Sequence, residues 1–169
     1  MHELTKNGAS FSPDRVFRYK LWRTLRSPEE SGSFEKPLVV IGLNPSTADE
    51  TEDDPTIRRL RGFAARDGFD KLIMLNLFAF RSTDPAAMKR APDPVGPWND
   101  DVILSSCMDR TVLCAWGTHG AFKGRGDKVA RLLNGKAKLV TLGVTKEGFP
   151  KHPLYLANDT PMVEFKGAS

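Results

Sequence analysis

Three short apolar runs divide the chain, each bounded by glycine, proline or asparagine. They are Leu38–Ile41, Leu72–Leu77 and Thr111–Ala115, and a fourth candidate follows at Lys138–Leu142. Runs of this kind, with no alternating polar position, are typical of strands buried on both faces of a parallel sheet. Polar residues just beyond such strands lie at the edge where open α/β sheets bind ligands. The pattern therefore predicts one crevice built from several strand ends.

Helical patterns occupy the intervals between these runs. In Pro55–Phe69 a proline suits the first turn, apolar residues recur at helical spacing, and Gly68 marks the end. Asp100–Met108 and Asp127–Leu133 are further candidate helices, the former after a proline-rich loop over Arg81–Asn99. The alternation predicts a three-layer α/β/α sandwich with a central, mainly parallel sheet and helices on both faces.

Two segments with different patterns precede the first core strand. Phe17–Arg23 alternates basic and apolar residues, which fits either an edge strand or a short amphipathic helix. Ser27–Lys36 is polar with proline and glycine, so it predicts a surface loop. We expect a single domain over residues 1–169, in which 1–36 form an N-terminal extension packed on an α/β core of residues 37–160.

Composition narrows the class of protein further. The 169 residues are 40% hydrophobic, enough for a sizeable core, and a net charge of +4 permits contact with phosphates without requiring it. Cys107 and Cys114 lack CxxC spacing, so they form neither a disulfide framework nor a four-cysteine metal site. No apolar run approaches the roughly 18 residues of a membrane helix. We expect a cytoplasmic protein with no membrane partner, and the sequence assigns no oligomeric state.

Three polar residues stand out near the ends of the predicted strands. Asn44 follows the first strand, where it either closes an Asx turn or holds a water or a polar ligand edge. Asn76 lies within an apolar run, where an amide costs stability unless backbone or a ligand binds it. His152 follows a glycine-rich turn, and it is either a structural loop residue or a functional one, which donates to a developing anion when neutral or binds phosphate when protonated.

Several motifs of the chain resemble those of known families. They are Arg18-Tyr19, Gly42–Asp49, Asp54–Thr56, Asn76–Ala79, Asp93–Pro97, Trp116-Gly117 and His152–Tyr155. Together they resemble the bacterial domain-of-unknown-function family 1643, whose name supplies no reaction. More distantly, the order of Gly42–Pro45, Asn76, Trp116-Gly117 and His152-Pro153 is similar to the uracil-DNA glycosylase superfamily, in which such motifs surround one base pocket.

The glycosylase resemblance implies a uracil-DNA-glycosylase-like fold and a role for each matching residue. Asn44 would orient the attacking water, Asn76 would hydrogen-bond the base edge, and His152 would stabilise charge on the leaving base. Tyr155 would belong to a loop that enters the DNA stack, or would be a hydrophobic anchor. The other residues implied in substrate binding are Gly42, Pro45, Ser46, Phe78, Trp116, Gly117 and Pro153. No cofactor is required for this chemistry.

An acidic stretch over residues 49–54 departs from the glycosylase pattern. Its five carboxylates oppose a DNA backbone unless a cation intervenes. They form either a solvated helix start or a Mg²⁺ site beside bound phosphate. The residues of the metal hypothesis are Asp49, Asp53 and Asp54 as ligands, with Arg58, Arg59 or Arg81 on the phosphate.

The sequence leaves three classes of function open. The leading expectation is a nucleobase-recognising N-glycosidic hydrolase that acts on nucleic acid or on a nucleotide. The alternatives are a metal-dependent nucleotide or phosphoester hydrolase that uses the acidic loop, and a non-catalytic nucleotide or nucleic-acid binding module. A basic stretch with Lys123, Arg125 and Lys128 is either a phosphate-contacting or a solvated loop. All three classes take a nucleic acid or nucleotide ligand, and Mg²⁺ is the cofactor considered.

Overall fold

The computed structural model describes residues 7–26 and 35–167. Most of the surface loop predicted at Ser27–Lys36 lies outside the described residues. In chain order the elements are β1 (Asn7–Phe11), β2 (Arg18–Thr24), β3 (Pro37–Gly42), α2 (Pro55–Arg66), β4 (Lys71–Asn76), α3 (Pro85–Arg90), α4 (Asn99–Cys107), β5 (Thr111–Cys114), the 3₁₀ segment η1 (Thr118–Gly124), α5 (Arg125–Leu133), β6 (Lys138–Thr141) and β7 (Val163–Glu164). The predicted core strands and helices are therefore present, with ends that differ by a few residues.

The strands form one mixed sheet in the order β1-β2-β4-β3-β5-β6-β7. Its centre, β4-β3-β5-β6, is parallel, whereas β1, β2 and β7 run antiparallel to their neighbours. The expected mainly parallel sheet is thus restricted to the centre. The strand–helix alternation of the sequence covers only these central strands, since a short turn is enough to join antiparallel strands such as β1 and β2.

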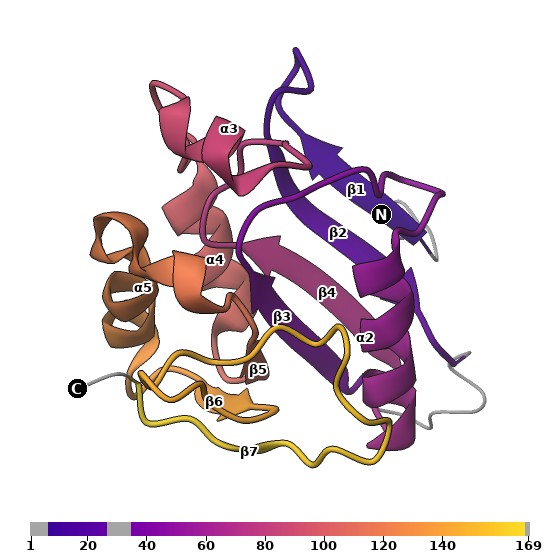
Figure 1. The fold of residues 1–169 in the computed structure, drawn as a ribbon. Coiled ribbons are helices and arrows are strands. Elements are labelled where there is room, and N and C mark those ends of the chain that lie inside the picture. Colours follow the sequence, from indigo (N-terminus) through magenta and orange to yellow (C-terminus); the bar gives the residue numbers. More distant parts are fainter. Residues whose placement is uncertain (1–6, 27–34, 168–169) are drawn as a thin grey trace.

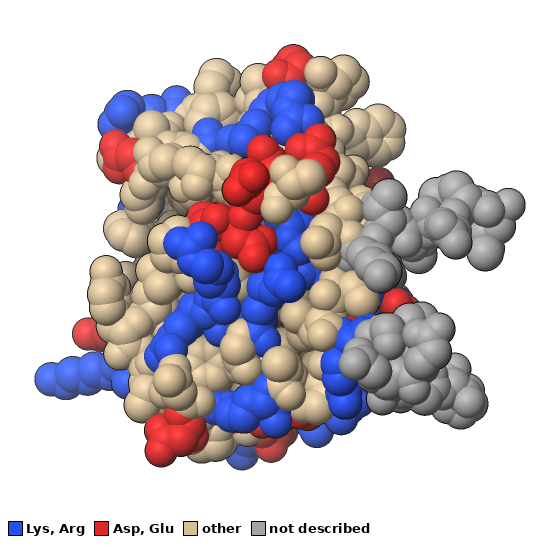
Figure 2. All heavy atoms as spheres, turned by 90° about the vertical axis from the view of Figure 1, so that its right-hand side faces the viewer, with Lys and Arg blue, Asp and Glu red and all other residues tan. Residues whose placement is uncertain are grey.

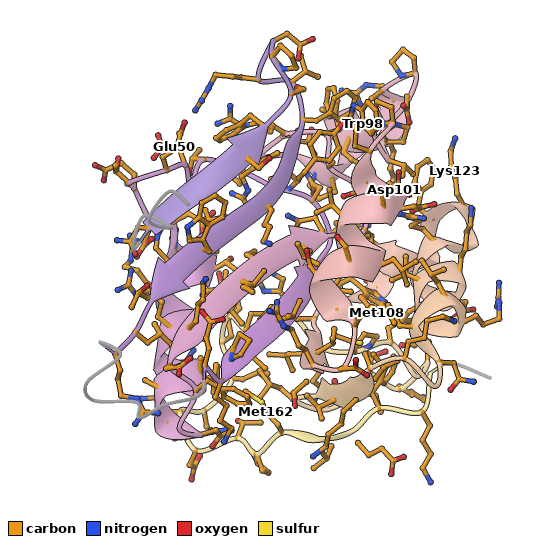
Figure 3. The ribbon with its side chains drawn as sticks, turned by 180° about the vertical axis from the view of Figure 1, so that it is seen from behind. Glu50, Trp98, Asp101, Met108, Lys123 and Met162 are labelled. Carbon is orange, nitrogen blue, oxygen red and sulfur yellow. The ribbon has the colours of Figure 1, made fainter. Side chains whose placement is uncertain are left out.

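Helices cover both faces of the sheet (Figure 1). Leu38 and Val40 belong to one buried cluster with the apolar side of α2, whereas Val39 and Ile41 belong to a second cluster with α4 and α5. The view from behind shows α4 lying across the sheet, with Asp101 in its first turn and Met108 just past its last residue (Figure 3). Because each central strand faces a helical layer on both sides, its sequence is apolar at successive positions.

The N-terminal residues contribute strands to the sheet. Arg18–Thr24 forms β2, which lies between β1 and β4, so of the two alternatives the strand is correct but its edge position is wrong. The edge is β1, joined to β2 by a turn in which the Ser12 N–H donates to the Phe17 carbonyl at 2.9 Å. A strand placed inside a sheet explains why both Arg18 and Arg23 are buried.

The parallel centre brings three strand ends to one edge of the sheet. Gly42 of β3 is in register with Asn76 of β4, and Ile41 is in register with Cys114 of β5. The loops beyond them continue the contact, because the Leu77 N–H donates to the Gly42 carbonyl at 2.9 Å. In the part of the chain that the structure describes, no helix is long and apolar enough to cross a membrane.

Candidate functional site

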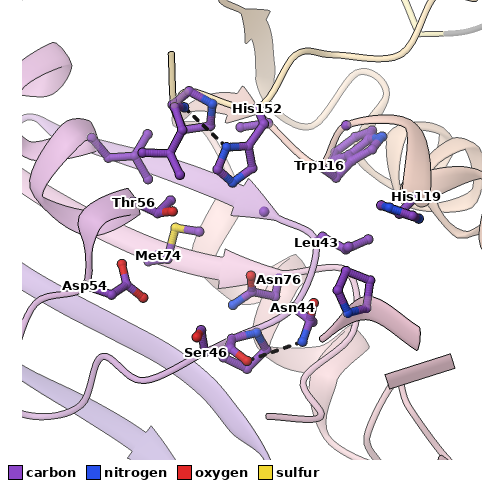
Figure 4. A pocket seen from close by; sticks show the side chains of 18 of the residues that line it. Leu43, Asn44, Ser46, Asp54, Thr56, Met74, Asn76, Trp116, His119 and His152 are labelled. Carbon is purple, nitrogen blue, oxygen red and sulfur yellow. Dashed lines mark hydrogen bonds between the residues drawn. The ribbon is translucent and has the colours of Figure 1, made fainter. Parts of the chain in front are cut away.

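A cavity of about 560 Å³ opens at this edge of the sheet. Residues from all three strand ends line it, together with the start of α2 and the loop around His152 (Figure 4). Of the residues singled out in the sequence, the lining includes Gly42, Asn44, Pro45, Ser46, Asp54, Asn76, Trp116, Gly117, His152 and Pro153. The volume is in the range of small-molecule sites. Residues far apart in the sequence therefore share one ligand-sized space.

Asn44 holds the loop after β3 to the loop after β4. Its Nδ2 donates to the carbonyls of Ser82 at 2.9 Å, and of Phe80 and Pro45 at 3.3 Å. Three carbonyl acceptors around one atom identify that atom as the amide nitrogen, because a carbonyl oxygen there would meet only other acceptors. Within the described residues Oδ1 of Asn44 has no hydrogen-bond donor, so the residue presents a fixed acceptor beside the cavity.

Asn76 is the most unusual polar group of the site. Only 2% of the residue is exposed, and its Nδ2 is buried without a hydrogen-bond partner among the described residues. Gly42 makes room for this side chain, since a Cβ at position 42 would lie 3.0 Å from Oδ1 of Asn76 and 2.6 Å from Cε of Met74. A buried, unpartnered amide is costly, which marks Asn76 as a group suited to hydrogen-bond a ligand.

The backbone at the end of β4 is fixed from the opposite face of the sheet. Nδ2 of Asn99 donates to the carbonyls of Asn76 and Leu77, both at 3.0 Å, and Nε of Arg125 donates to Leu77 at 2.9 Å. Arg125 also forms an ion pair with Asp100 at 2.5 Å. Arg125 is therefore a buried positioning residue, and its predicted place in a phosphate-contacting or solvated loop is wrong.

The loop that carries His152 is attached to the sheet by backbone hydrogen bonds. The Gly117 N–H donates to Pro150 at 2.8 Å, and the Lys151 N–H donates to Gly143 at 2.9 Å. Gly117 adopts a φ of 69°, which glycine tolerates without a steric penalty. Trp116, which precedes it, packs edge-on against Phe165 and forms part of the cavity wall.

His152 is held as a hydrogen-bond donor toward the cavity. Its Nδ1 accepts the Leu154 N–H at 3.2 Å, which leaves the proton of the neutral imidazole on Nε2. The residue as a whole is exposed, yet desolvation lowers the pKa of its imidazole below the usual 6.5, and the carboxylate of Asp54 opposes this shift. His152 is therefore neutral at pH 7, with Nε2–H available to a ligand.

Two further residues line the cavity that the sequence analysis did not assign to the site. Arg18 is 2% exposed, and within the described residues its guanidinium donates one hydrogen bond, from Nη1 to Ala48 at 2.9 Å. His119 also lines the cavity, and the Lys89 ammonium donates to its Nδ1 at 3.0 Å. Arg18 lies on β2 and His119 lies in η1, so their proximity to the strand ends depends on tertiary contacts, such as the pairing of β2 with β4, that local periodicity does not display.

Two of the predicted substrate contacts lie outside the cavity lining. Phe78 is completely buried and packs against Phe122 with ring centroids 5.6 Å apart, so it belongs to the core. Tyr155 is 100% exposed and adopts a φ of 71°. Its side chain projects into solvent and does not line the cavity. The two roles given to it, entry into a DNA stack and hydrophobic anchoring, stay predictions.

The acidic loop is organised by protein groups. Asp53 pairs with buried Arg23 at 2.7 Å and with Arg61 at 3.0 Å. Asp49 caps its own turn by accepting the Glu52 N–H at 2.8 Å, and Asp54 caps α2 by accepting the Ile57 N–H at 2.8 Å. In the space-filling view, acidic side chains on this face gather between groups of basic ones (Figure 2).

These contacts do not fit the metal hypothesis. Across residues 7–26 and 35–167, no group of three or more His, Cys, Asp or Glu side chains is arranged to hold a metal ion. Of the three predicted ligands only Asp54 lines the cavity. None of the arginines assigned to phosphate is among the described lining residues, and each donates to another protein group: Arg58 to the Asp53 carbonyl, Arg59 to Asn158, and Arg81 to the Arg15 carbonyl. The helix-start alternative accounts for the observed bonds.

The fold and the cavity define an α/β protein with a ligand-sized site at the carboxyl ends of a parallel strand cluster. The family described as "Protein of unknown function (DUF1643)" matches residues 18–154. The chain belongs to this family, which confirms the first of the two resemblances. No curated protein and no solved structure matches the chain.

Proposed function

We propose that this protein is a nucleobase-recognising N-glycosidic hydrolase of uracil-DNA-glycosylase type. The observation that carries the proposal is the meeting of Asn44, Asn76 and His152 around one cavity. Each offers a different hydrogen-bonding group: Asn44 the acceptor Oδ1, Asn76 the unpartnered donor Nδ2, and His152 the donor Nε2–H. These are the groups that hydrolysis of a bond between a sugar and a base requires.

Recognition of the base falls to Asn76. A nucleobase edge offers carbonyl and ring-nitrogen acceptors, which complement a buried N–H donor. Because Nδ2 of Asn76 already lacks a partner, a ligand that satisfies it removes an existing cost instead of adding one. The same logic disfavours ligands without an acceptor at this position, so the amide supplies selectivity as well as affinity.

Stabilisation of the leaving group falls to His152. When the glycosidic bond breaks, both bonding electrons leave with the base, which becomes anionic, and the sugar develops oxocarbenium character. A preorganised donor aimed at that anion acts mainly in the transition state. The Nε2–H of His152 is such a donor at pH 7, because desolvation keeps the pKa of the imidazole low and Nδ1 is occupied by the Leu154 N–H.

Asn44 orients the water that completes the reaction. Its Oδ1 accepts a hydrogen bond from the water, whose oxygen adds to the anomeric carbon as the base departs. The proton that the water releases ends on the departing base or in solvent, so the overall reaction consumes one water and yields free base and a sugar that carries a hydroxyl group at its anomeric carbon and keeps its phosphate. Rigid attachment of Asn44 to three carbonyls supports this role, since an orienting group must itself be fixed.

The fold assignment is part of the same proposal. We place the chain in the uracil-DNA-glycosylase type because its motifs occur in that order along the chain and because β3, β4 and β5 bring them to one sheet edge. Metal-dependent hydrolysis has less support, since Asp49 and Asp53 are bound by protein groups away from the cavity. A chelator is therefore expected to leave base release unchanged.

The decisive experiment is a screen for released base. Purified protein is incubated with DNA and nucleotides that carry uracil, hypoxanthine or modified pyrimidines, and free base is detected by mass spectrometry. On a substrate that reacts, His152→Ala is expected to reduce turnover about a hundredfold or more with little change in melting temperature. Lys146→Ala, at an exposed neighbouring position outside the cavity, is the matched control. Ligand binding with no base released from any substrate contradicts hydrolysis and leaves a binding module.

A further inference from the structure

Arg18 is a buried cation whose hydrogen-bonding capacity is mostly unused. Its guanidinium carries five N–H donors, yet within the described residues the only acceptor it meets is the Ala48 carbonyl. Its Nε is buried and has no partner there, and no carboxylate of that part of the chain lies within ion-pair distance. Both Arg18 and Asn76 therefore bring unused donors to one cavity.

The charge on Arg18 persists despite its burial. Desolvation lowers the pKa of the guanidinium to about 10, with the carboxylate of Asp54 acting in the opposite direction. A group with this pKa is protonated at pH 7. Removing a cation from water without an ion-pair partner costs several kcal/mol in general, so the fold carries a cost at Arg18 that an anionic ligand would offset.

The remaining charges of the cavity also favour an anion. Among the described lining residues the charged groups are Arg18, Lys151 and Asp54, beside the two histidines. Arg18, Lys151 and Asp54 together carry one positive charge in excess. Asp54 is partly neutralised by its hydrogen bond from the first turn of α2, and positive partial charge at that helix end offsets it further.

We propose that Arg18 binds the phosphate of a nucleoside monophosphate whose base contacts Asn76, so that the ligand is a free nucleotide. This inference rests on the proposed function for the identity of the base, and it adds the substrate class. The planar guanidinium pairs well with a phosphate through parallel N–H donors, which a lysine at the same place would not reproduce.

The position of Arg18 favours a monomer over a polymer. The residue is almost completely buried, so only a group that enters the cavity reaches it. A terminal phosphate has chain on one side and enters with its nucleoside, whereas an internal phosphodiester has chain on both sides and stays at the surface.

Calorimetry with matched ligands tests the inference. The probes are the 5′-monophosphates and the nucleosides of uracil, cytosine and hypoxanthine, together with inorganic phosphate and a uracil-containing oligodeoxynucleotide. For at least one base, the monophosphate is expected to bind with a Kd about tenfold or more below that of the nucleoside. Arg18→Met should abolish this preference while leaving nucleoside affinity unchanged. Lys128→Gln, which removes an exposed charge on α5, should retain it.

Several results would overturn the inference. One is equal affinity for nucleosides and monophosphates; another is a phosphate preference that survives Arg18→Met. Base release from the oligonucleotide alone, unaffected by Arg18→Met, would reject the free-nucleotide substrate and keep N-glycosidic hydrolysis. Conversely, if the monophosphate binds through Arg18 but no base is released, the proposed hydrolysis is rejected and the proposed phosphate site at Arg18 is retained. If the variant does not fold, the wild-type preference between nucleotide and nucleoside still decides the question.

Discussion

Arg18 and Arg23 lie on the same strand and are almost equally buried, but their surroundings differ. Arg23 is 0% exposed, and each guanidinium nitrogen has an acceptor, among them Asp53 at 2.7 Å and the Asp49 carbonyl at 2.6 Å. Arg18 is 2% exposed and meets one carbonyl among the described residues. Arg23 closes the acidic loop onto the sheet, whereas Arg18 faces the cavity.

The two arginines show one side chain in two environments: the protein bonds every guanidinium nitrogen of Arg23, whereas Arg18 keeps unused donors. A buried cation whose donors are all bonded contributes to the shape of the protein and has little left for a ligand. One whose donors are unused lowers stability until something else binds it. In the acidic loop, for which the sequence left open a solvated helix start or a metal site, protein groups satisfy the hydrogen-bonding atoms described above. In the cavity, Arg18 and Asn76 keep donors that no described protein group accepts. By the criterion of unsatisfied hydrogen-bond donors, the cavity is a better candidate site than the acidic loop.

The largest expected effect is on stability, at Arg23. Arg23→Met removes the buried partner of Asp53, which keeps only its ion pair with the more exposed Arg61, and takes the guanidinium donors away from several loop carbonyls. The free energy of unfolding should therefore fall by about 3–5 kcal/mol. Arg18→Met should change it by about 1 kcal/mol or less, because it removes a buried charge with one hydrogen bond. Urea denaturation of both variants measures the contrast. An equal decrease in the free energy of unfolding of the two variants would mean that Arg18 and Arg23 stabilise the fold to the same extent.

A smaller effect is expected at Gly42, which adjoins the unsatisfied amide. Gly42→Ala places a methyl group 3.0 Å from Oδ1 of Asn76 and 2.6 Å from Cε of Met74, so both side chains must shift. The variant should lose about 1–3 kcal/mol of stability and bind base-containing ligands more weakly.

Gly62→Ala is the matched control for that substitution. Gly62 lies in α2, and a Cβ added there would have no neighbouring atom within 4 Å. The same change should therefore stabilise the protein by about 0.5–1 kcal/mol and leave binding unaltered. Thermal denaturation measures the stability of Gly42→Ala and Gly62→Ala, and calorimetry measures their affinity for base-containing ligands. An unchanged affinity in Gly42→Ala would argue against Asn76 as a ligand contact.

The smallest expected effect is a shift in the titration of His152. Desolvation lowers the pKa of this imidazole below 6.5 and Asp54 partly counteracts it, so Asp54→Asn should lower the pKa further. NMR titration of the ring protons measures both values. Because the unfolded chain takes up the proton at higher pH than the folded protein, the stability that neutral His152 contributes is present above pH 6.5 and is lost as the pH falls below it. A wild-type pKa well above 7 would mean that His152 is mostly protonated at neutral pH, and would contradict the neutral donor of the proposed mechanism.

The central strands and helices could be predicted from the sequence because their signals are local. Runs such as Leu38–Ile41 are apolar at successive positions, and a strand buried on both faces requires that. The order of the strand ends likewise predicted that Asn44, Asn76 and His152 would lie near one another, and all three line the cavity. Their chemical roles remain predictions.

The partners of the charged residues were decided only by the tertiary structure. A row of acidic residues is the same in sequence whether its oxygens bind Mg²⁺ or a buried arginine from a distant strand, and the pairing of β2 with β4 made it the latter. That pairing also placed Arg18 beside the cavity, and the packing of the opposite layer turned Arg125 toward the end of β4. Periodicity records which residues are buried, since burial depends on the local face of a strand or helix. Which donor meets which acceptor depends on contacts between distant segments, and these arise only when the strands have been ordered in the sheet.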